Sequence, residues 1–163
     1  MAWRLHRLYV TNANPGYALV LNKRDFVFIY LNMLTGETNL NTLLKNMTPM
    51  LNEDDYVYCT TTSLNSINTD DIIAFVKEQE AITLILKKET ADKLNLEYSY
   101  VATWITLTIH SSLEATGLTA AFATVLTKEN ISCNVVAAYY HDHIFVAKKD
   151  ADRAMEALKK LSE

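Results

Sequence analysis

The stretch from Thr103 to His110 alternates between two kinds of side chain. One set is apolar (Ile105, Leu107 and Ile109), and the other set is Trp104, Thr106, Thr108 and His110. Side chains of a β-strand point in turn to the two sides of its sheet, so this period of two predicts a strand with one core face. The other face is polar but uncharged, and we expect it to meet a partner or a second sheet.

Helical periodicity follows this strand. Between Gly117 and Glu129 the apolar residues recur at the three- and four-residue spacing of one helix face; they are Leu118, Ala121, Phe122, Val125 and Leu126. Strands are expected next at 134–140 and 143–147, joined by a tight turn at His141 and Asp142. Asp150 then caps a last helix, with Lys159 and Lys160 at its C-terminal end, where cations are favoured. The second half, residues 99–163, therefore has the predicted order β-α-β-β-α.

The first half, residues 33–98, shows a related pattern. A helix is expected from Asn39, its capping residue, to Met47. Strands are expected at 56–62 and 82–86, where aromatic and β-branched residues gather.

Between these strands, a turn, or a turn that contains a short strand, is expected at 63–68, and a second helix at about 70–78. Thr69 is the predicted cap of that helix, and Ile72, Phe75 and Val76 form its predicted buried stripe. A helical turn is expected within 89–98. Each half is then one strand short of a six-element unit. Because bare sheet edges associate with other strands, we expect the two halves, or two chains, to cover each other's edges.

Composition excludes several classes of protein. Of the 163 residues, 50% are hydrophobic and 21% are charged, which suits a packed domain rather than a disordered chain. Three Gly and two Pro leave no room for a flexible linker. The net charge of −4 and the lack of a basic cluster disfavour nucleic acid as a partner. No apolar run approaches the roughly 20 residues of a membrane span.

The two cysteines, Cys59 and Cys133, lie far apart in predicted strands and form no zinc-binding spacing. We therefore expect both thiols to be reduced. With no export signal visible after Arg4 and Arg7, the predicted location is the cytoplasm.

Two blocks of the second half carry a family resemblance. One runs from Ile105 to Phe122 and includes the sequence His-Ser-Ser-Leu-Glu-Ala at 110–115. The other runs from Ile131 to Val146 and includes Tyr-Tyr-His-Asp-His at 139–143. Together they resemble bacterial tandem ACT-domain proteins, which are related to the ACT modules of eukaryotic arginine sensors.

The resemblance covers about 33–161 and implies an α+β fold with two tandem, packed ACT-type modules of ferredoxin-like βαββαβ topology. The modules are expected at 33–98 and 99–163. Residues 1–32 have no counterpart in this family and are expected to be an N-terminal extension, which would lie outside the native protein if translation begins at Met33. The intact mass of the native protein tests that expectation.

The same resemblance implies an amino-acid-binding regulatory protein rather than an enzyme. In place of the family's Asp-x-Pro-Gly turn, this chain has Glu114, Thr116 and Gly117. The ligand is expected at the loop 111–118, near a module or subunit interface. The expected ligand-binding residues are Ser111, Ser112, Glu114, Thr116, Gly117, Leu118, Asn134, Tyr140, His141 and Asp142.

The loop 111–118 has features that suit the binding of a free amino acid. It leads into a helix N-terminus, whose free N–H groups and dipole attract a carboxylate. Gly117 allows close approach of a ligand to the backbone. Glu114 is expected to hold the ligand's ammonium group. The plain alternative is a helix start that Ser111 or Ser112 caps, with Glu114 merely exposed.

Other chemistries have weaker support. His141 and His143 have a chelating spacing, but they are expected at a hairpin tip with no further ligand, so no metal site is predicted. No Ser-His-Asp order, P-loop or dinucleotide-binding motif is present, so neither catalytic residues nor a cofactor are expected. The expected partners are a free amino acid and a second copy of the chain, as a homodimer. The alternative is a protein–protein interaction module that binds no small molecule.

Overall fold

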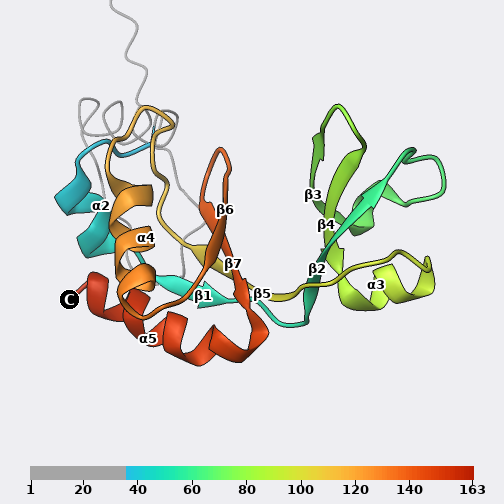
Figure 1. The fold of residues 1–163 in the computed structure, drawn as a ribbon. Helices are drawn as coiled ribbons and strands as arrows, with labels where there is room; N and C mark the ends of the chain where they lie inside the picture. The colour runs from blue at the N-terminus through green and yellow to red at the C-terminus, as the bar shows by residue number, and fades with distance from the viewer. Residues whose placement is uncertain (1–35) are drawn as a thin grey trace, which may run out of the picture. The chain divides into compact units, whose positions relative to one another are not determined.

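The structure is a computed structural model, and it describes residues 36–163 (Figure 1). The expectations for residues 1–32 lie outside these described residues. The helices are α2 (Leu40–Asn46), α3 (Lys88–Lys93), α4 (Leu118–Lys128) and α5 (Ala151–Leu161), with 3-10 turns η1 (Thr69–Asp71) and η2 (Lys148–Asp150). The strands are β1 (Pro49–Leu51), β2 (Tyr56–Thr61), β3 (Ile72–Lys77), β4 (Ile82–Lys87), β5 (Val101–Leu107), β6 (Cys133–Ala137) and β7 (Asp142–Ala147). None of the described helices is both long enough and apolar enough to cross a membrane.

All seven strands belong to one antiparallel sheet, in the order β3-β4-β2-β5-β7-β6, with β1 also paired to β5. The central strand β5 pairs with β7 from Ala102 to Leu107. Its first residues also pair with β2, through Ala102 and Tyr56. Its last residues pair with β1, through Ile105 and Leu51. Thus β5 is shared by the two halves of the chain.

The second half has the ferredoxin-like arrangement. Its elements follow the order β5-α4-β6-β7-α5, and β1 supplies the last strand, so that the local sheet order is β1-β5-β7-β6. The α+β, ferredoxin-like fold is therefore confirmed. The prediction that the halves cover each other's edges holds in part: β1 of the first half pairs with β5 of the second, whereas β3 and β6 remain the edge strands of the described sheet.

Helix α2 packs with the helices of the second half rather than with β2, β3 and β4 of its own half. Figure 1 shows α2, α4 and α5 together beside β1 and β7, whereas α3 lies against β2 and β4. Leu43 of α2 and Met47, which follows the helix, are buried in one core with Ile105, Phe122 and Leu158. As predicted, Asn39 caps α2, and its Oδ1 accepts a hydrogen bond from the Thr42 N–H at 3.0 Å.

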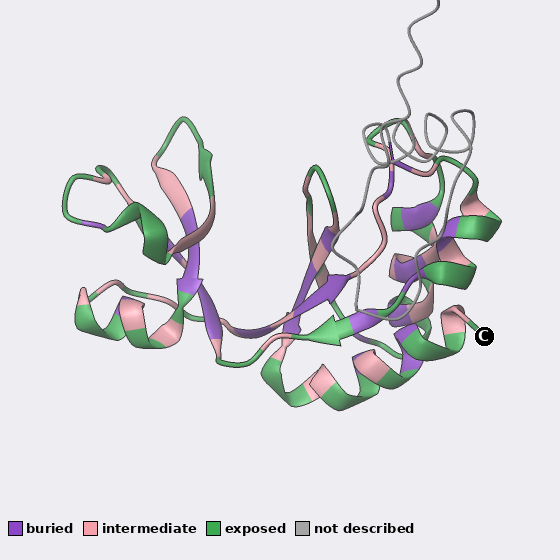
Figure 2. Ribbon diagram, turned by 180° about the vertical axis from the view of Figure 1, so that it is seen from behind, coloured by how far each residue is buried: buried purple, intermediate pink, exposed green. Residues whose placement is uncertain are grey.

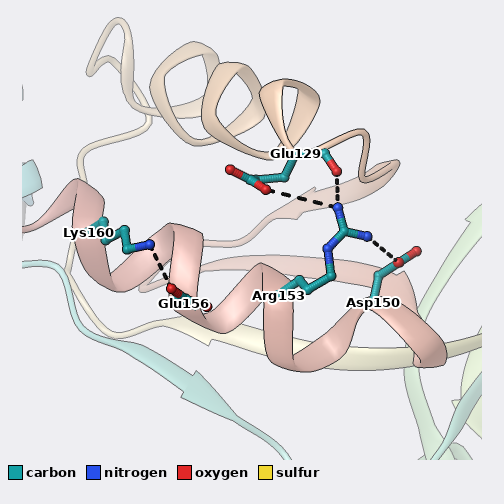
Figure 3. A network of polar contacts seen from close by, with 5 residues as sticks. All are labelled: Glu129, Asp150, Arg153, Glu156 and Lys160. Atoms are coloured by element: carbon teal, nitrogen blue, oxygen red, sulfur yellow. Dashed lines mark hydrogen bonds and ion pairs between the residues drawn. The ribbon is translucent and has the colours of Figure 1, made fainter.

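An arginine links the two long helices (Figure 3). Arg153 of α5 donates from Nη1 to the Asp150 carboxylate at 3.1 Å, and from Nη2 to the backbone carbonyl of Glu129, just after α4. Asp150 precedes α5 as expected, but its side chain bonds to Arg153 rather than to a helix N–H. On the next turns of α5, Lys160 pairs with Glu156 at 2.7 Å. The Arg153 contacts join the end of α4 to the start of α5.

The helix predicted at 70–78 is wrong. Asn68, not Thr69, caps the short turn η1, and strand β3 follows at once. Of the predicted buried stripe, Ile72 is half-buried, whereas Phe75 and Val76 are exposed. β-Branched residues fit a strand better than a helix, and a short apolar run cannot distinguish the two by periodicity. Here the antiparallel pairing with β4 makes this segment a strand.

The ends of two predicted strands also differ. β5 ends at Leu107, so Thr108 and His110 lie in the following loop. β6 ends at Ala137, and the turn occupies 138–141, so Asp142 is the first residue of β7 rather than part of the turn.

The polar face of β5 is covered within the chain. Trp104 contacts Tyr56 edge-on with ring centroids 5.2 Å apart, and it stacks on Phe145 at 5.9 Å. Thr106 is buried on the same side. This face therefore gives no support to a dimer.

Two truncations test this assignment of buried and exposed elements. Leu43→Ala removes a fully buried side chain from α2 and is expected to lower the free energy of unfolding by about 2–5 kcal/mol. Phe75→Ala removes a side chain of β3 that is 50% exposed, and we expect a change of no more than about 1 kcal/mol. Urea denaturation of both variants measures the difference. A larger loss for Phe75→Ala than for Leu43→Ala contradicts the strand assignment of 72–77.

Candidate functional site

A small cavity of about 80 Å³ lies where the loop after β5, the start of α4 and the start of β7 meet. It is lined by Ser111, Ser112, Leu113, Ala115, Leu118, Thr119, Ala137 and Asp142. Asp142 lies opposite Leu107 of β5 and Ala137 of β6 in the sheet, so its side chain is on the side that α4 covers.

The segment before α2 holds the loop in place. Glu37 donates its N–H to His110 O and accepts from the Ser112 N–H, both at 2.9 Å. Gly36 has φ +72°, and a Cβ there would lie 2.5 Å from the Ser112 nitrogen. Only glycine allows the two backbones to approach this closely. Residues 36–37 therefore fix the position of Ser111 and Ser112.

Gly117 sets the start of α4. Its φ of +96° lies in the region that side chains disfavour, and an added Cβ would lie 2.9 Å from the Leu40 side chain. The first hydrogen bond inside α4 joins the Ala121 N–H to Gly117 O at 2.9 Å. The N–H groups of Leu118, Thr119 and Ala120 therefore have no acceptor within the helix, and they give this end a partial positive charge.

Asp142 gives the cavity its negative group. The residue is only 6% exposed, and no hydrogen bond or ion pair of its carboxylate is found among the described residues, although its oxygens keep some access to solvent. Burial raises the pKa of Asp142, and the positive charge that His141 can carry acts in the opposite direction. A carboxylate that is largely removed from water and has no protein partner is penalised, so a cationic group in the cavity would be stabilised.

Four of the sequence-predicted residues line this cavity: Ser111, Ser112, Leu118 and Asp142. Glu114, Thr116 and Gly117 lie in the same loop but are exposed and outside its lining. The acid that the cavity contains is therefore Asp142 rather than Glu114.

The remaining three predicted residues lie elsewhere. Tyr140 is exposed in the turn, where its ring lies 5.3 Å from that of His110. His141 places Nδ1 3.3 Å from Ile109 O and so ties the turn to the loop. Asn134 is at the far end of β6, and its Nδ2 donates to Phe145 O at 3.4 Å.

Sequence reasoning missed the other cavity residues. Ala137 could have been found from the hairpin register, because it pairs with Asp142. Thr119 follows from the helix start at Leu118. Apart from their place in the loop 111–118, nothing in the sequence indicates that Leu113 and Ala115 line a cavity.

On the opposite side of β7, a polar network joins three segments. The Trp104 Nε1–H donates to His143 Nδ1 at 3.0 Å, and the Thr106 hydroxyl lies 3.2 Å from the same nitrogen. Asn52 in turn donates to Thr106 Oγ1 at 2.9 Å. Since an indole N–H can only donate, His143 Nδ1 must be unprotonated. Burial lowers the pKa of His143, and the neighbouring His141 lowers it further.

A larger, open hollow of about 480 Å³ lies at the start of α3. Six of its charged side chains are paired with each other: Lys87 with Asp54 and Lys88 with Asp92 at 2.6 Å, and Lys148 with Asp55 at 2.7 Å. The seventh, Glu89, pairs with Lys93 at 2.7 Å. Because these exposed charges already have partners of opposite sign, the hollow does not favour a charged ligand. In the part of the chain that the structure describes, no three His, Cys, Asp or Glu side chains gather to hold a metal ion.

Comparison with known proteins agrees with the fold. Two family models described as ACT domain match residues 35–103 and 99–160. A solved Vibrio cholerae protein of unknown function, VC0802, described as a possible transport protein, is 47% identical; the similarity covers 76% of this chain and 96% of that one, with a TM-score of 0.68. No curated protein matches the sequence.

The fold also matches more distant structures. The regulatory subunits of aspartate kinase from Thermus thermophilus and Thermus flavus align with TM-scores of 0.55 and 0.51 at 7% and 8% identity. The alignments cover 74% and 71% of this chain and 99% and 97% of those chains. The chain belongs to the ACT-domain family and carries two ACT domains in tandem, a type of domain that regulates rather than catalyses.

Acidification is expected to break the Trp104–His143 contact, because a proton on Nδ1 would face the indole N–H. The folded-state pKa lies below the ordinary value of 6.5, so the related stability is complete above that value and is lost as pH falls below it. Trp104 fluorescence in a Trp3→Phe background should change with a midpoint below 6.5. His143→Gln, which can accept the same bond without titrating, should abolish the transition. A midpoint at or above 6.5 contradicts the network.

Asp142→Asn is expected to stabilise the folded protein at neutral pH. The raised pKa means that burial penalises the charged form, and the amide removes that charge at nearly constant volume. We expect a gain on the order of 1 kcal/mol in the free energy of unfolding, measured with urea. The gain should shrink as pH falls and Asp142 becomes protonated. A loss of stability at neutral pH would show that the carboxylate already has a compensating partner.

Proposed function

We propose that this chain is an amino-acid-binding regulatory protein and not an enzyme, with its ligand at the loop 111–118. The observation that supports this most directly is Asp142, a residue only 6% exposed, whose carboxylate has no hydrogen-bond partner among the described residues and which lines a cavity together with the start of α4. A free amino acid is a zwitterion, so it needs an anionic and a cationic partner close together. Asp142 suits its ammonium group, and the free N–H groups of Leu118 and Thr119 suit its carboxylate.

The size of the cavity limits what it holds. About 80 Å³ corresponds to two or three water molecules at about 30 Å³ each. This volume suits the ammonium and carboxylate end of an amino acid, whereas complete pockets for small molecules are usually several times larger. The side chain of the ligand would then extend out of the cavity, past Leu113.

Two further features belong to this proposal. Cys59 and Cys133 are free thiols, which supports a reducing, cytoplasmic location. Strands β3 and β6 end the described sheet, and their outer edges support a homodimer. Size-exclusion chromatography with light scattering tests the dimer, and a monomer at micromolar concentration contradicts it.

A thermal-shift screen against the common amino acids tests the ligand. A ligand that binds only the folded state stabilises it by about 2.7 kcal/mol at a hundred times its dissociation constant. We expect a clear shift for at least one amino acid, lost in Asp142→Asn and kept in Asp152→Asn, an exposed acid on α5.

Glu114→Gln separates the two candidate acids. Its carboxylate is exposed outside the cavity lining, so the shift is expected to persist in this variant. Loss of the shift in Glu114→Gln, with retention in Asp142→Asn, would assign the ammonium group to Glu114 instead.

The alternative is a protein–protein interaction module without a small ligand. Exposed apolar side chains on the edge strand β3 favour it, with Phe75 50% and Val76 58% exposed. Under this alternative no amino acid shifts the melting temperature at millimolar concentration. Phe75→Ser would instead weaken capture of a partner protein, while Asp142→Asn would leave it unchanged.

A further inference from the structure

The two ACT domains have the same strand register around the place where the cavity lies. In the second domain, β7 begins with Asp142, which faces Leu107 at the end of β5 and Ala137 at the end of β6. In the first domain, β4 begins with Ile82, which faces Thr61 at the end of β2 and Lys77 at the end of β3. Ile82 is therefore the positional counterpart of Asp142.

Ile82 cannot replace the carboxylate. It is half-buried and packs against the core formed by Val57, Cys59 and Leu84. An apolar side chain at this point leaves the ammonium group of an amino acid without an anionic partner, and would remove its hydration without compensation.

The first domain also lacks the helix start. After β2 the chain passes through residues 62–71 directly into β3, and η1, which comprises only three residues, is its sole helical turn. Asp70 and Asp71 lie in that turn and would repel a carboxylate. In the second domain the loop 108–117 instead leads into the 11-residue helix α4.

A side chain fills the space that a helix would cover. Ile67 of the loop is 7% exposed and packs into the first domain's core, with Leu64 beside it. The Ile67 N–H bonds to Leu64 O at 3.0 Å, which holds the loop against the sheet. Figure 2 shows exposed residues along the rest of this loop and along the tip of the β3–β4 hairpin.

From these three differences we infer that only the second ACT domain binds an amino acid, so that each chain takes up one ligand. This inference rests on the proposed function. The first domain keeps the sheet and supplies β1 and residues 36–37, which support the second domain's site, but it has no site of the same kind.

Native mass spectrometry of the full chain, titrated with each of the common L-amino acids, counts the ligands directly. We expect one bound molecule per chain for any amino acid that stabilises the protein. Asp142→Asn should abolish that species. Asn65→Ala and Asp70→Asn, both exposed in the first domain's loop, should leave the dissociation constant unchanged within about twofold.

The outcomes separate the two proposals. Two bound molecules per chain, one molecule per two chains, or weakened binding in the Asn65 and Asp70 variants would overturn the single-site inference while leaving amino-acid binding intact. A complete absence of bound amino acid would overturn the proposed function and the inference together. Calorimetric titration gives an independent count of the same stoichiometry.

Discussion

Pairing along β5 is the interaction on which the rest of this structure depends. One strand forms hydrogen-bonded ladders with β2 at one end, β1 at the other and β7 throughout. Because Ala102 is small, Tyr56 and Tyr58 of β2 reach Phe145 of β7 across it, with ring centroids 6.2 and 5.8 Å apart. The two domains thus share a strand and an aromatic cluster, so neither can be removed without exposing buried surface of the other.

The candidate site follows from this sharing. β7 aligns Asp142 with the end of β5, and the segment before α2 pins the loop that carries Ser111. Three parts of the chain that are distant in sequence therefore meet at a cavity that none of them forms alone. The unpartnered carboxylate lowers the stability of the folded state, as is common where a protein keeps a group for a ligand rather than for folding.

The two ACT domains differ at the positions that would have to be alike if both bound the same kind of ligand. Their strands share one register, yet the first domain has Ile82 and a loop where the second has Asp142 and α4. Under the proposed function, one domain would serve as the framework and the other as the sensor. This division is consistent with the low similarity between the two loop sequences, 62–71 and 108–117.

The sequence by itself determined the fold class, the helices α2, α4 and α5, and the loop 111–118, because strong periodicity and capping residues act locally. It did not determine β3, since the short run Ile72–Lys77 suits a helix or a strand until β4 pairs with it. The sequence placed both Glu114 and Asp142 among the expected ligand-binding residues and gave the ammonium group to Glu114, whereas the tertiary structure places Asp142 in the cavity lining and Glu114 outside it. Only strand register and helix packing decide which of two acids is buried, because burial depends on neighbours that are distant in sequence.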